Sequence, residues 1–373
     1  MNTAGKTENF ERKEGTSSII AGDYRGGAMY LANGPLTFNG VTFTSNQATY
    51  GGGMYINRSG TSEFKITNSK FEGNKAVASS KDEEPSGFGG AIHIQNGNVR
   101  ITSSLFGQDI NNKGQKIGNP NTANYGGAIS LKQGTLLIGE IVSGTEGSVD
   151  TKNVTFRSNT ASIDGGALYL DGTSGRQSSK TILNNVLFDG NTATSGKGGA
   201  IASYSYFEVN STTFASNRAS NGGAVYVGAQ GTYDEAGKSY TDLRKGEGHF
   251  KTGIMTGNSA TNGGAIYVDD LYKDEAGLIL KHEKSPDYIQ ELASRTSNSG
   301  NDGFVTYVVI SEGFGSTQEK DPRIAIYGNR ADKNGGAIYA NNGVVNNSTN
   351  IVNNSAKQNG GGLAIMSAYF IQE

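Results

Sequence analysis

The sequence predicts an all-β protein that forms a parallel β-helix, a solenoid whose coils stack along one axis. Three observations lead to this prediction. A Gly-Gly-Ala motif recurs along the chain, an apolar-x-x-Asn motif alternates with it, and no ten-residue window has the apolar spacing of an amphipathic helix. Regular alternation of two motifs is typical of repeat proteins, in which each repeat forms one small structural unit.

The first motif is a Gly-Gly pair followed by a small residue and then an aliphatic residue. Its ten copies begin at Gly26, Gly51, Gly89, Gly126, Gly165, Gly198, Gly222, Gly263, Gly335 and Gly360. Successive copies are separated by 25, 38, 37, 39, 33, 24, 41, 72 and 25 residues. The shortest spacing, 24–25 residues, therefore gives the length of one coil, and we interpret longer spacings as coils that carry insertions.

The second motif has an apolar residue, usually Phe, three positions before an Asn. Clear copies occupy residues 43–46, 71–74, 156–159, 188–191 and 214–217, and looser copies occupy residues 255–258, 326–329 and 351–354. Residues 106–109 keep the apolar residue, with Asp109 in the place of Asn. We expect the apolar residue in the core. We expect the Asn at a corner, where its amide can bond to the equivalent Asn of neighbouring coils and where left-handed backbone is tolerated.

Residues 198–221 represent one coil without an insertion. These 24 residues divide into three short strand-like pieces that are separated by small or polar residues. Such a unit has the size of one coil of a parallel β-helix, and its coils would stack at the ~4.8 Å spacing of paired strands. About ten coils would form a rod roughly 45–50 Å long.

Alternation along the strand after each Gly pair predicts which side chains fill the core. The residue after Gly-Gly-Ala is always aliphatic and the residue two positions later is mostly aliphatic, so both are expected inside. The residue between them should point outward. In six copies it is Tyr, and stacked coils would align these residues into an exposed tyrosine ladder. This ladder is the candidate binding surface, consisting of Tyr30, Tyr55, Tyr169, Tyr226, Tyr267 and Tyr339. Alternatively, the tyrosines only cover an outer sheet face.

The glycines and the second motif are expected to be structural. Glycine suits a corner that needs positive φ or close approach of two backbones, and the small third residue fits a tight bend. There is no G-x-x-x-x-G-K-[ST] sequence and no helix is expected to follow, so the glycine pairs are not a phosphate-binding loop. The representative motif residues are Gly165, Gly166, Ala167, Gly222, Gly223, Ala224, Gly263, Gly264, Ala265, Phe156, Asn159, Phe188, Asn191, Phe214 and Asn217.

Composition excludes several function classes. Of 373 residues, 56 are Gly and only 34% are hydrophobic, so repeated thin apolar layers suit the chain better than one large core. The net charge of −2 provides no basic field for nucleic acid. The absence of Cys excludes disulfides, thiolate catalysis and Cys-ligated zinc. No apolar run approaches the ~18 residues of a membrane helix.

The domain organisation follows from the spacing of the motifs. Residues 1–20 are predicted as a polar lead-in and residues 21–373 as a single rod, and we expect the chain to be a fragment of a longer protein. Insertions are expected near residues 75–88, 107–125, 139–152, 229–249 and 269–323, of which the last is the largest. Within it, residues 303–310 read as a strand and residues 285–295 as a short helix. Insertions on a solenoid often form the binding face.

The alternating Gly-Gly-Ala-[Ile/Leu/Val] and Phe-x-x-Asn motifs resemble the repeats of the chlamydial polymorphic membrane proteins, a family of autotransporter adhesins. The resemblance covers roughly residues 26–365, and similar repeats occur in surface proteins of other bacteria. It implies a right-handed parallel β-helix of about ten coils with inserted loops. It also implies a passenger domain at the bacterial cell surface, in the outer membrane or secreted, that binds host cells through its repeat region. The absence of Cys departs from the family pattern.

Three functions follow as expectations. The first is an adhesin fragment, not an enzyme and without a cofactor or metal, that binds a host-cell receptor (protein or glycan) through the rod and its insertions. The second is a carbohydrate-active β-helix, of the lyase, hydrolase or phage tailspike type, which would need two or three carboxylates within about 5–10 Å. For this role Asp164 and Asp189 are the only weak candidates. The third is a passive spacer stalk. Open coil ends could also pair into homo-oligomers.

Overall fold

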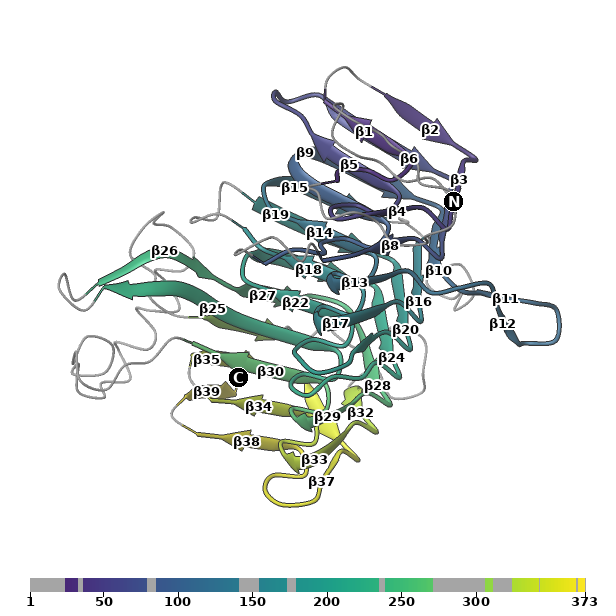
Figure 1. Cartoon of the computed structure of the whole chain (residues 1–373). Coiled ribbons are helices and arrows are strands. Elements are labelled where there is room, and N and C mark those ends of the chain that lie inside the picture. Colours follow the sequence, from purple (N-terminus) through teal and green to yellow (C-terminus); the bar gives the residue numbers. More distant parts are fainter. Residues whose placement is uncertain are drawn as a thin grey trace.

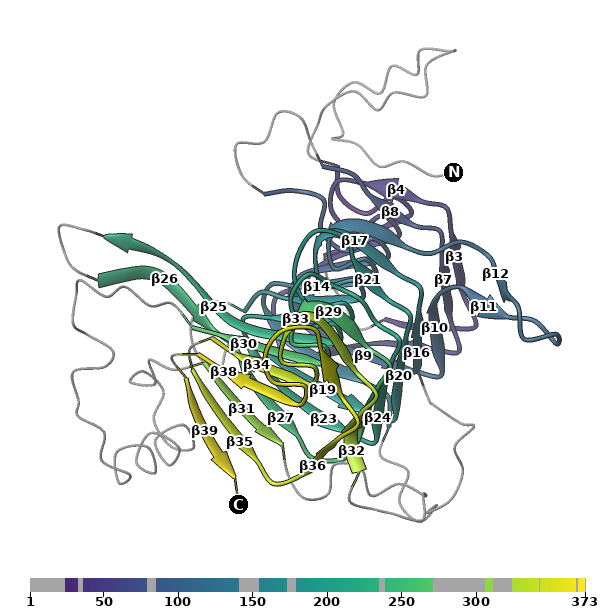
Figure 2. The same cartoon turned by 90° about the horizontal axis from the view of Figure 1, so that it is seen from below.

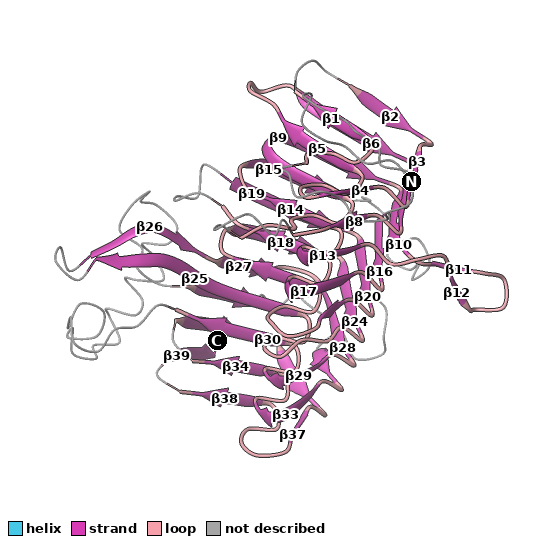
Figure 3. Cartoon of the chain, in the orientation of Figure 1, coloured by secondary structure: helices cyan, strands magenta, loops and turns pink. Residues whose placement is uncertain are grey.

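The computed structural model describes residues 24–32, 36–78, 85–140, 154–172, 179–234, 239–270, 306–310, 324–341, 343–366 and 368–372. Over these residues the chain contains strands and no helix (Figure 3). The strands stack in parallel along one axis, from β1 at one end to β38 and β39 at the other (Figure 1). The predicted parallel β-helix is confirmed, whereas the number of about ten coils stays a prediction.

Each coil crosses three main faces and a short fourth strip before the next Gly pair begins a new coil. In residues 198–221 the three predicted strand pieces are β22 (Ile201–Ser203), β23 (Tyr206–Asn210) and β24 (Thr212–Ala215), one on each main face. Arg218 then forms parallel bridges on the fourth strip with Thr192 and Ser259. Seen along the stack, the faces enclose the core (Figure 2).

The first face follows the Gly pairs and the second face follows the first. The first face contains β1 (Met29–Leu31), β5 (Met54–Asn57), the start of β9 (Ile92–Thr102), β14 (Ile129–Leu131), β18 (Leu168–Leu170), β22, the start of β25 (Val225–Asp234), β30 (Ile266–Asp269), β34 (Ile338–Ala340) and β38 (Leu363–Ile365). The second face contains β2 (Thr37–Asn39), β6 (Glu63–Thr67), the end of β9, β15 (Gly134–Ile138), β19 (Ser179–Asn184), β23, β27 (Glu247–Phe250), β31 (Tyr307–Ile310), β35 (Val344–Asn347) and β39 (Tyr369–Gln372).

The third face carries the Phe-x-x-Asn motif, and the fourth strip connects it to the next Gly pair. The third face contains β3 (Thr42–Thr44), β7 (Lys70–Glu72), β10 (Ser104–Gly107), β16 (Val154–Arg157), β20 (Val186–Asp189), β24, β28 (Gly253–Thr256), β32 (Ile324–Tyr327) and β36 (Asn350–Val352). The fourth strip contains β4 (Gln47–Ala48), β8 (Lys75–Ala76), β13 (Thr122–Tyr125), β17 (Thr160–Asp164), β21 (Thr192–Ala193), β29 (Ser259–Asn262), β33 (Arg330–Asn334) and β37 (Ser355–Ala356).

The core repeats the same residue types from coil to coil because the pairing keeps equivalent motif positions in register. On the first face Ile201 pairs with Val225, and Val225 pairs with Ile266. All three are fully buried, which confirms the predicted inward positions. On the third face the six Phe residues from Phe43 to Phe214 stack with ring centroids 4.7–5.0 Å apart. This separation matches the spacing of paired strands, so the ring stack and the backbone pairing reinforce each other.

The Asn residues of the second motif form a buried amide ladder, as expected. Asn191 Nδ2 donates to the Phe156 carbonyl of the preceding coil (2.9 Å) and to Asn217 Oδ1 of the following coil (3.0 Å). Its Oδ1 accepts hydrogen bonds from Nδ2 and the backbone N–H of Asn159, both 3.0 Å long. Each Asn side chain therefore satisfies its own hydrogen-bonding groups and those of a neighbouring corner inside the rod.

The left-handed backbone of this corner falls on the residue before each Asn, not on the Asn as expected. Ser158 has φ 59°, Gly190 has φ 65° and Ser216 has φ 56°. The turn at this residue directs the following Asn side chain inward, where it joins the ladder.

The role expected for Asp109 is wrong. The ladder position of this coil belongs to Asn121, whose Nδ2 donates to the Phe71 carbonyl (2.8 Å) and to Asn159 Oδ1 (2.9 Å). An antiparallel hairpin, β11 (Asp109–Ile110) and β12 (Lys116–Ile117), separates Asn121 from its Phe and projects from the rod (Figure 1). Asp109 lies on this hairpin, with its carboxylate 3.7 Å from Lys70 Nζ.

The two glycines of each pair are required for different reasons. Gly222 has φ +67°, a left-handed conformation that other residues adopt only with strain. A Cβ on Gly223 would lie 2.1 Å from the carbonyl oxygen of Gly264 in the next coil. Ala224 is fully buried, which leaves little room for a larger residue. These positions leave little room for other side chains, and the purely structural role of the representative motif residues from Phe156 to Ala265 stays a prediction.

Two predicted insertions leave the rod as strands. Residues 107–125 contain the β11–β12 hairpin, and residues 229–249 contain an antiparallel arm of β25 and β26 (Ser239–Lys245). The strand expected at residues 303–310 is present as β31, which pairs with β27 and β35 on the second face, so the chain rejoins the rod within residues 269–323. The short helix expected at residues 285–295 lies outside the described residues.

Candidate functional site

The six tyrosines of the predicted ladder align on the first face, and we call them the tyrosine column. Tyr226, Tyr267 and Tyr339 pair in register, with ring centroids 5.6 and 4.9 Å apart. The prediction that the column is exposed is wrong for five of its members. Tyr55, Tyr169, Tyr226, Tyr267 and Tyr339 have exposed fractions of 8% or less, and only Tyr30, at 48%, is open. A contact surface of exposed rings is therefore excluded for those five.

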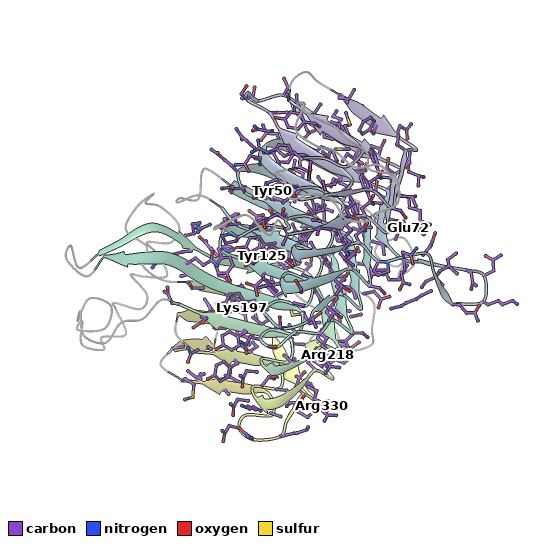
Figure 4. The ribbon with its side chains drawn as sticks, viewed as in Figure 1. Tyr50, Glu72, Tyr125, Lys197, Arg218 and Arg330 are labelled. Atoms are coloured by element: carbon purple, nitrogen blue, oxygen red, sulfur yellow. The ribbon has the colours of Figure 1, made fainter. Side chains whose placement is uncertain are left out.

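The tyrosines are buried because a second set of side chains packs over them. These side chains belong to the residues directly before the Gly pairs, which we call the pre-glycine column. Within it, Tyr50 forms a parallel β-bridge with Phe88, and Phe88 forms one with Tyr125. The rings of Phe88 and Tyr125 lie 5.8 and 5.1 Å from the ring of Tyr169. Each Gly pair thus turns the chain so that the end of the fourth strip lies against the outer side of the first face. Tyr50, Tyr125 and Lys197 of this column follow one another along the rod (Figure 4).

Around Tyr204 and Tyr226 the rings of the tyrosine column pack against one another and are buried. Ala202 occupies the tyrosine position of its coil, and Tyr204 fills the resulting space with its ring 5.8 Å from both Tyr169 and Tyr226. Lys197 Nζ lies 4.5 Å from the centroid of the Tyr226 ring, a cation–π contact. Burial raises the pKa of Tyr169, Tyr204 and Tyr226 well above the ordinary value, so these phenols stay neutral.

The column is interrupted nearer to β1, where His93 and Ser130 take the place of Tyr. Their side chains share a hydrogen bond of 2.6 Å and both are buried. Ser130 is much smaller than Tyr, and no side chain equivalent to Tyr204 compensates for it in the sequence, where Lys132 stands at that place. The coil of β14 therefore leaves a space on the outer side of the first face.

This space is part of a cleft of about 660 Å³, which we call the Ser130 cleft. Its volume lies within the range of small-molecule sites. Six of its lining side chains are aromatic rings and most of the others are polar. The lining residues are Arg25, Tyr50, Tyr55, Asn57, Pro85, Phe88, His93, Gln95, Tyr125, Ser130, Leu131, Lys132, Tyr169, Asp171, Gln230 and Arg244.

The charges of the cleft are unlike those of the whole chain. Among the described residues that line the cleft, Arg25, Lys132 and Arg244 are positive and Asp171 is negative, which gives 3 − 1 = 2 positive charges, while the chain has a net charge of −2. Asp171 forms an ion pair with Arg244. Burial raises the pKa of the Asp171 carboxyl, although Arg244 and Lys132 act in the opposite direction. The cleft is therefore suited to an anionic ligand, with the Asp171–Arg244 pair as a fixed polar wall.

The described residues that line the cleft do not include the acid pair that glycoside hydrolysis needs. Asp171 is the only carboxylate in this part of the lining, and Arg244 already forms an ion pair with it. Of the two carboxylates considered from the sequence, Asp164 accepts a hydrogen bond from the backbone N–H of Lys197 (2.8 Å) and Asp189 pairs with Arg157 (2.9 Å). Across the described ranges, no three His, Asp or Glu side chains are grouped so that they could hold a metal ion.

A second hollow lies along the fourth strip, on another side of the rod. Its volume is about 710 Å³, and small Thr, Ala and Ser residues form most of its walls. Arg218, Arg330 and Asp332 provide the charges, and Asp332 is bound by Lys357 (2.8 Å). This hollow contains no aromatic ring and no buried charged group, so the Ser130 cleft is the stronger candidate.

Sequence reasoning missed the pre-glycine column and therefore the cleft. The signal was present, because the residue before the Gly pair is aromatic in three successive copies, at Tyr50, Phe88 and Tyr125. Alternation within one strand places this residue outside, but it does not show that the next corner brings it against the tyrosines. Arg244 could not be assigned to the cleft from the sequence, because 73 positions separate it from its partner Asp171.

The Chlamydia polymorphic membrane protein repeat matches residues 153–171, 185–204, 211–228, 253–269 and 323–341. Each matched segment lies across the third face, the fourth strip and the first face, and contains a Phe-x-x-Asn copy or its looser form followed by a Gly pair. No curated protein and no solved structure shows significant similarity to the chain. Nor does the described part of the chain contain a helix with the length and hydrophobicity to span a membrane.

Proposed function

The chain belongs, by its repeats, to the Chlamydia polymorphic membrane protein family, and we propose that it is a bacterial surface adhesin that binds a host-cell receptor through the Ser130 cleft and the rod surface around it. The family name indicates membrane-associated proteins, which favours a location at the cell surface. The observation that carries the proposal is the interruption of the tyrosine column at Ser130, where the repeat opens into a cleft lined by rings and charges.

A passive spacer stalk accounts less well for this interruption. A stalk needs only that every coil pack on its neighbours. The coils from Tyr204 to Tyr339 meet this requirement, because the tyrosine side chains there are buried. The coils around Ser130 instead place three cations and six rings around an open space. Carbohydrate cleavage is disfavoured because the described residues that line the cleft offer a single, ion-paired carboxylate.

The proposal is tested with beads coated with the full chain and incubated with epithelial cells. We expect beads carrying the chain to adhere, and beads carrying the Lys132→Glu variant to adhere several-fold less, because the substitution reverses a charge at the mouth of the cleft. The matched control is Lys113→Glu, which makes the same change at an exposed position on the β11–β12 hairpin.

The outcomes separate the candidate functions. Adhesion no greater than that of beads coated with an unrelated β-helix would contradict the adhesin proposal. Equal loss in both lysine variants would contradict the role of the cleft and leave only general charge attraction. A chain from which residues 271–305 are removed should still adhere if the cleft suffices, and loss of adhesion there would place the contact on that insertion instead.

A further inference from the structure

We propose that the ligand of the Ser130 cleft is a saccharide that carries an acidic group, a carboxylate or a sulfate. This inference rests on the proposed function and specifies the chemistry of the receptor. It follows from three properties of the cleft: its size, the kind of partner that its walls can accept, and its charge.

The size of the cleft favours the end of a short sugar chain. A volume of about 660 Å³ lies within the range of sites that enclose one small molecule. A folded domain would need a much larger and flatter contact area. The cleft also opens on the side of the rod and not inside the core, because its floor is the outer side of β5, β9, β14 and β18.

The walls favour a saccharide over a peptide. An extended peptide commonly binds by adding its backbone to an open strand edge. The strands that floor the cleft offer no such edge, since β9 pairs with β5 and β14, and β14 pairs with β9 and β18. A sugar needs no backbone partner. Its C–H faces pack against the partly exposed aromatic rings of Tyr50, Phe88 and Tyr125.

Polar side chains around the rings match the hydroxyl groups of a sugar. Asn57, Gln95 and Gln230 are amides with both donors and acceptors, and all three line the cleft. The aromatic rings beside them are held in place: the partly buried rings of Phe88 and Tyr125 stack at 4.7 Å, and the His93–Ser130 hydrogen bond fixes the floor. A site with rigid rings and adaptable amides loses little conformational freedom on binding.

The charge of the cleft selects an acidic sugar over a neutral one. Lys132 is exposed at the mouth, Arg25 lies over the Tyr55 ring at 5.4 Å, and Arg244 holds Asp171. Because the described lining residues carry two positive charges in excess, the cleft attracts an anion although the chain as a whole is acidic. The guanidinium and ammonium groups are the usual partners of carboxylate and sulfate oxygens.

The experiment is a titration of the full chain by isothermal calorimetry with four probes: sialyllactose, a hyaluronan tetrasaccharide, a heparin tetrasaccharide and, as the neutral reference, lactose. We expect at least one acidic probe to bind about tenfold more tightly than lactose, and Lys132→Glu to weaken that binding about tenfold. Lys113→Glu should leave it unchanged. Binding of sialyllactose alone indicates sialic acid, binding of hyaluronan indicates uronic acid, and binding of heparin without hyaluronan indicates sulfate.

Several results would overturn the inference. The inference is wrong if no acidic probe binds at millimolar concentration, or if lactose binds with the same affinity as the acidic probes. It is also wrong if Lys113→Glu weakens binding as much as Lys132→Glu does, or if an octaglutamate peptide binds more tightly than any sugar. Circular dichroism of both variants verifies that a loss of affinity is not a loss of fold. If beads coated with the chain adhere to cells while every sugar fails, this inference is wrong and the adhesin function stands.

Discussion

At the scale of single residues, the buried Asn of each coil shows how a polar side chain can hold a solenoid together. Asn191 uses its amide and its backbone N–H on partners in both neighbouring coils, at 2.9–3.0 Å. Because the side chain is fully buried, water cannot replace any of these hydrogen bonds. The ladder therefore fixes the register of the coils as well as the corner itself.

We expect Asn191→Ala to lower the free energy of unfolding by roughly 2–5 kcal/mol, because it leaves the Phe156 carbonyl and the amide of Asn159 without their partner. Urea unfolding followed by circular dichroism measures the change. The control is Asn112→Ala on the exposed tip of the β11–β12 hairpin, which should change stability by less than about 0.5 kcal/mol. Similar values for both variants would mean that the ladder contributes nothing beyond a surface amide.

At the scale of the elements, the second face carries a charge cluster that links three successive coils. Glu208 of β23 contacts Lys180 of β19 at 3.2 Å and Lys251, just beyond β27, at 2.8 Å. Burial raises the pKa of Glu208, but hydrogen bonds from Lys251, Tyr206 and Lys180 outweigh it and lower the pKa to about 2. The carboxylate therefore stabilises the fold only while it is ionised.

This cluster makes part of the stability depend on pH. Because the folded pKa of about 2 lies below the ordinary value of 4.5, the stabilisation is complete above pH 4.5 and declines as pH falls toward 2. Glu208→Gln should remove this part of the decline. Urea midpoints between pH 7 and pH 2.5 would measure it, with Glu140→Gln as the control for loss of an exposed carboxylate. An unchanged acid profile in Glu208→Gln would contradict the assigned role.

The strands and corners could be predicted from the sequence because their determinants are local. Positions such as Ile266 and Val268 alternate within one strand, and Gly263 marks its beginning. The burial of Tyr267 could not be predicted in this way. It depends on what the neighbouring corners place over the strand, and insertions change the distance in sequence to those corners. The cleft depends in addition on Arg244, which the β25–β26 arm delivers to Asp171.

At the scale of the whole molecule, the described residues form a rod with two antiparallel projections, the β11–β12 hairpin and the β25–β26 arm (Figure 1). Residues 225–228 of β25 pair with β30 in the rod, whereas from Ala229 onward the strand pairs only with β26. The rod and the arm are thus held by separate sets of hydrogen bonds.

We expect the arm to be dispensable for folding. Replacing residues 231–243 by Asn-Gly keeps the pair of Gln230 and Arg244 and closes it with a two-residue turn. The melting temperature should change by no more than about 3 °C, because no rod pairing is lost. A large drop, measured by calorimetry, would show that the arm supports the coils from which it projects. Since Arg244 remains, binding to the Ser130 cleft should persist.

The stacking of coils also determines how the molecule should respond to force. Backbone hydrogen bonds between coils run along the rod axis, and in the described part of the chain each face strand pairs with the strands of the adjacent coils, so tension between the two ends acts on the outermost coil first. One coil of 24 residues would lengthen by about 80 Å when fully extended, from a rise of ~4.8 Å in the folded rod. Single-molecule stretching should therefore give a series of successive extensions and not one abrupt rupture. A rod of this kind would act as a dissipative tether, yielding coil by coil while the two surfaces it joins are pulled apart.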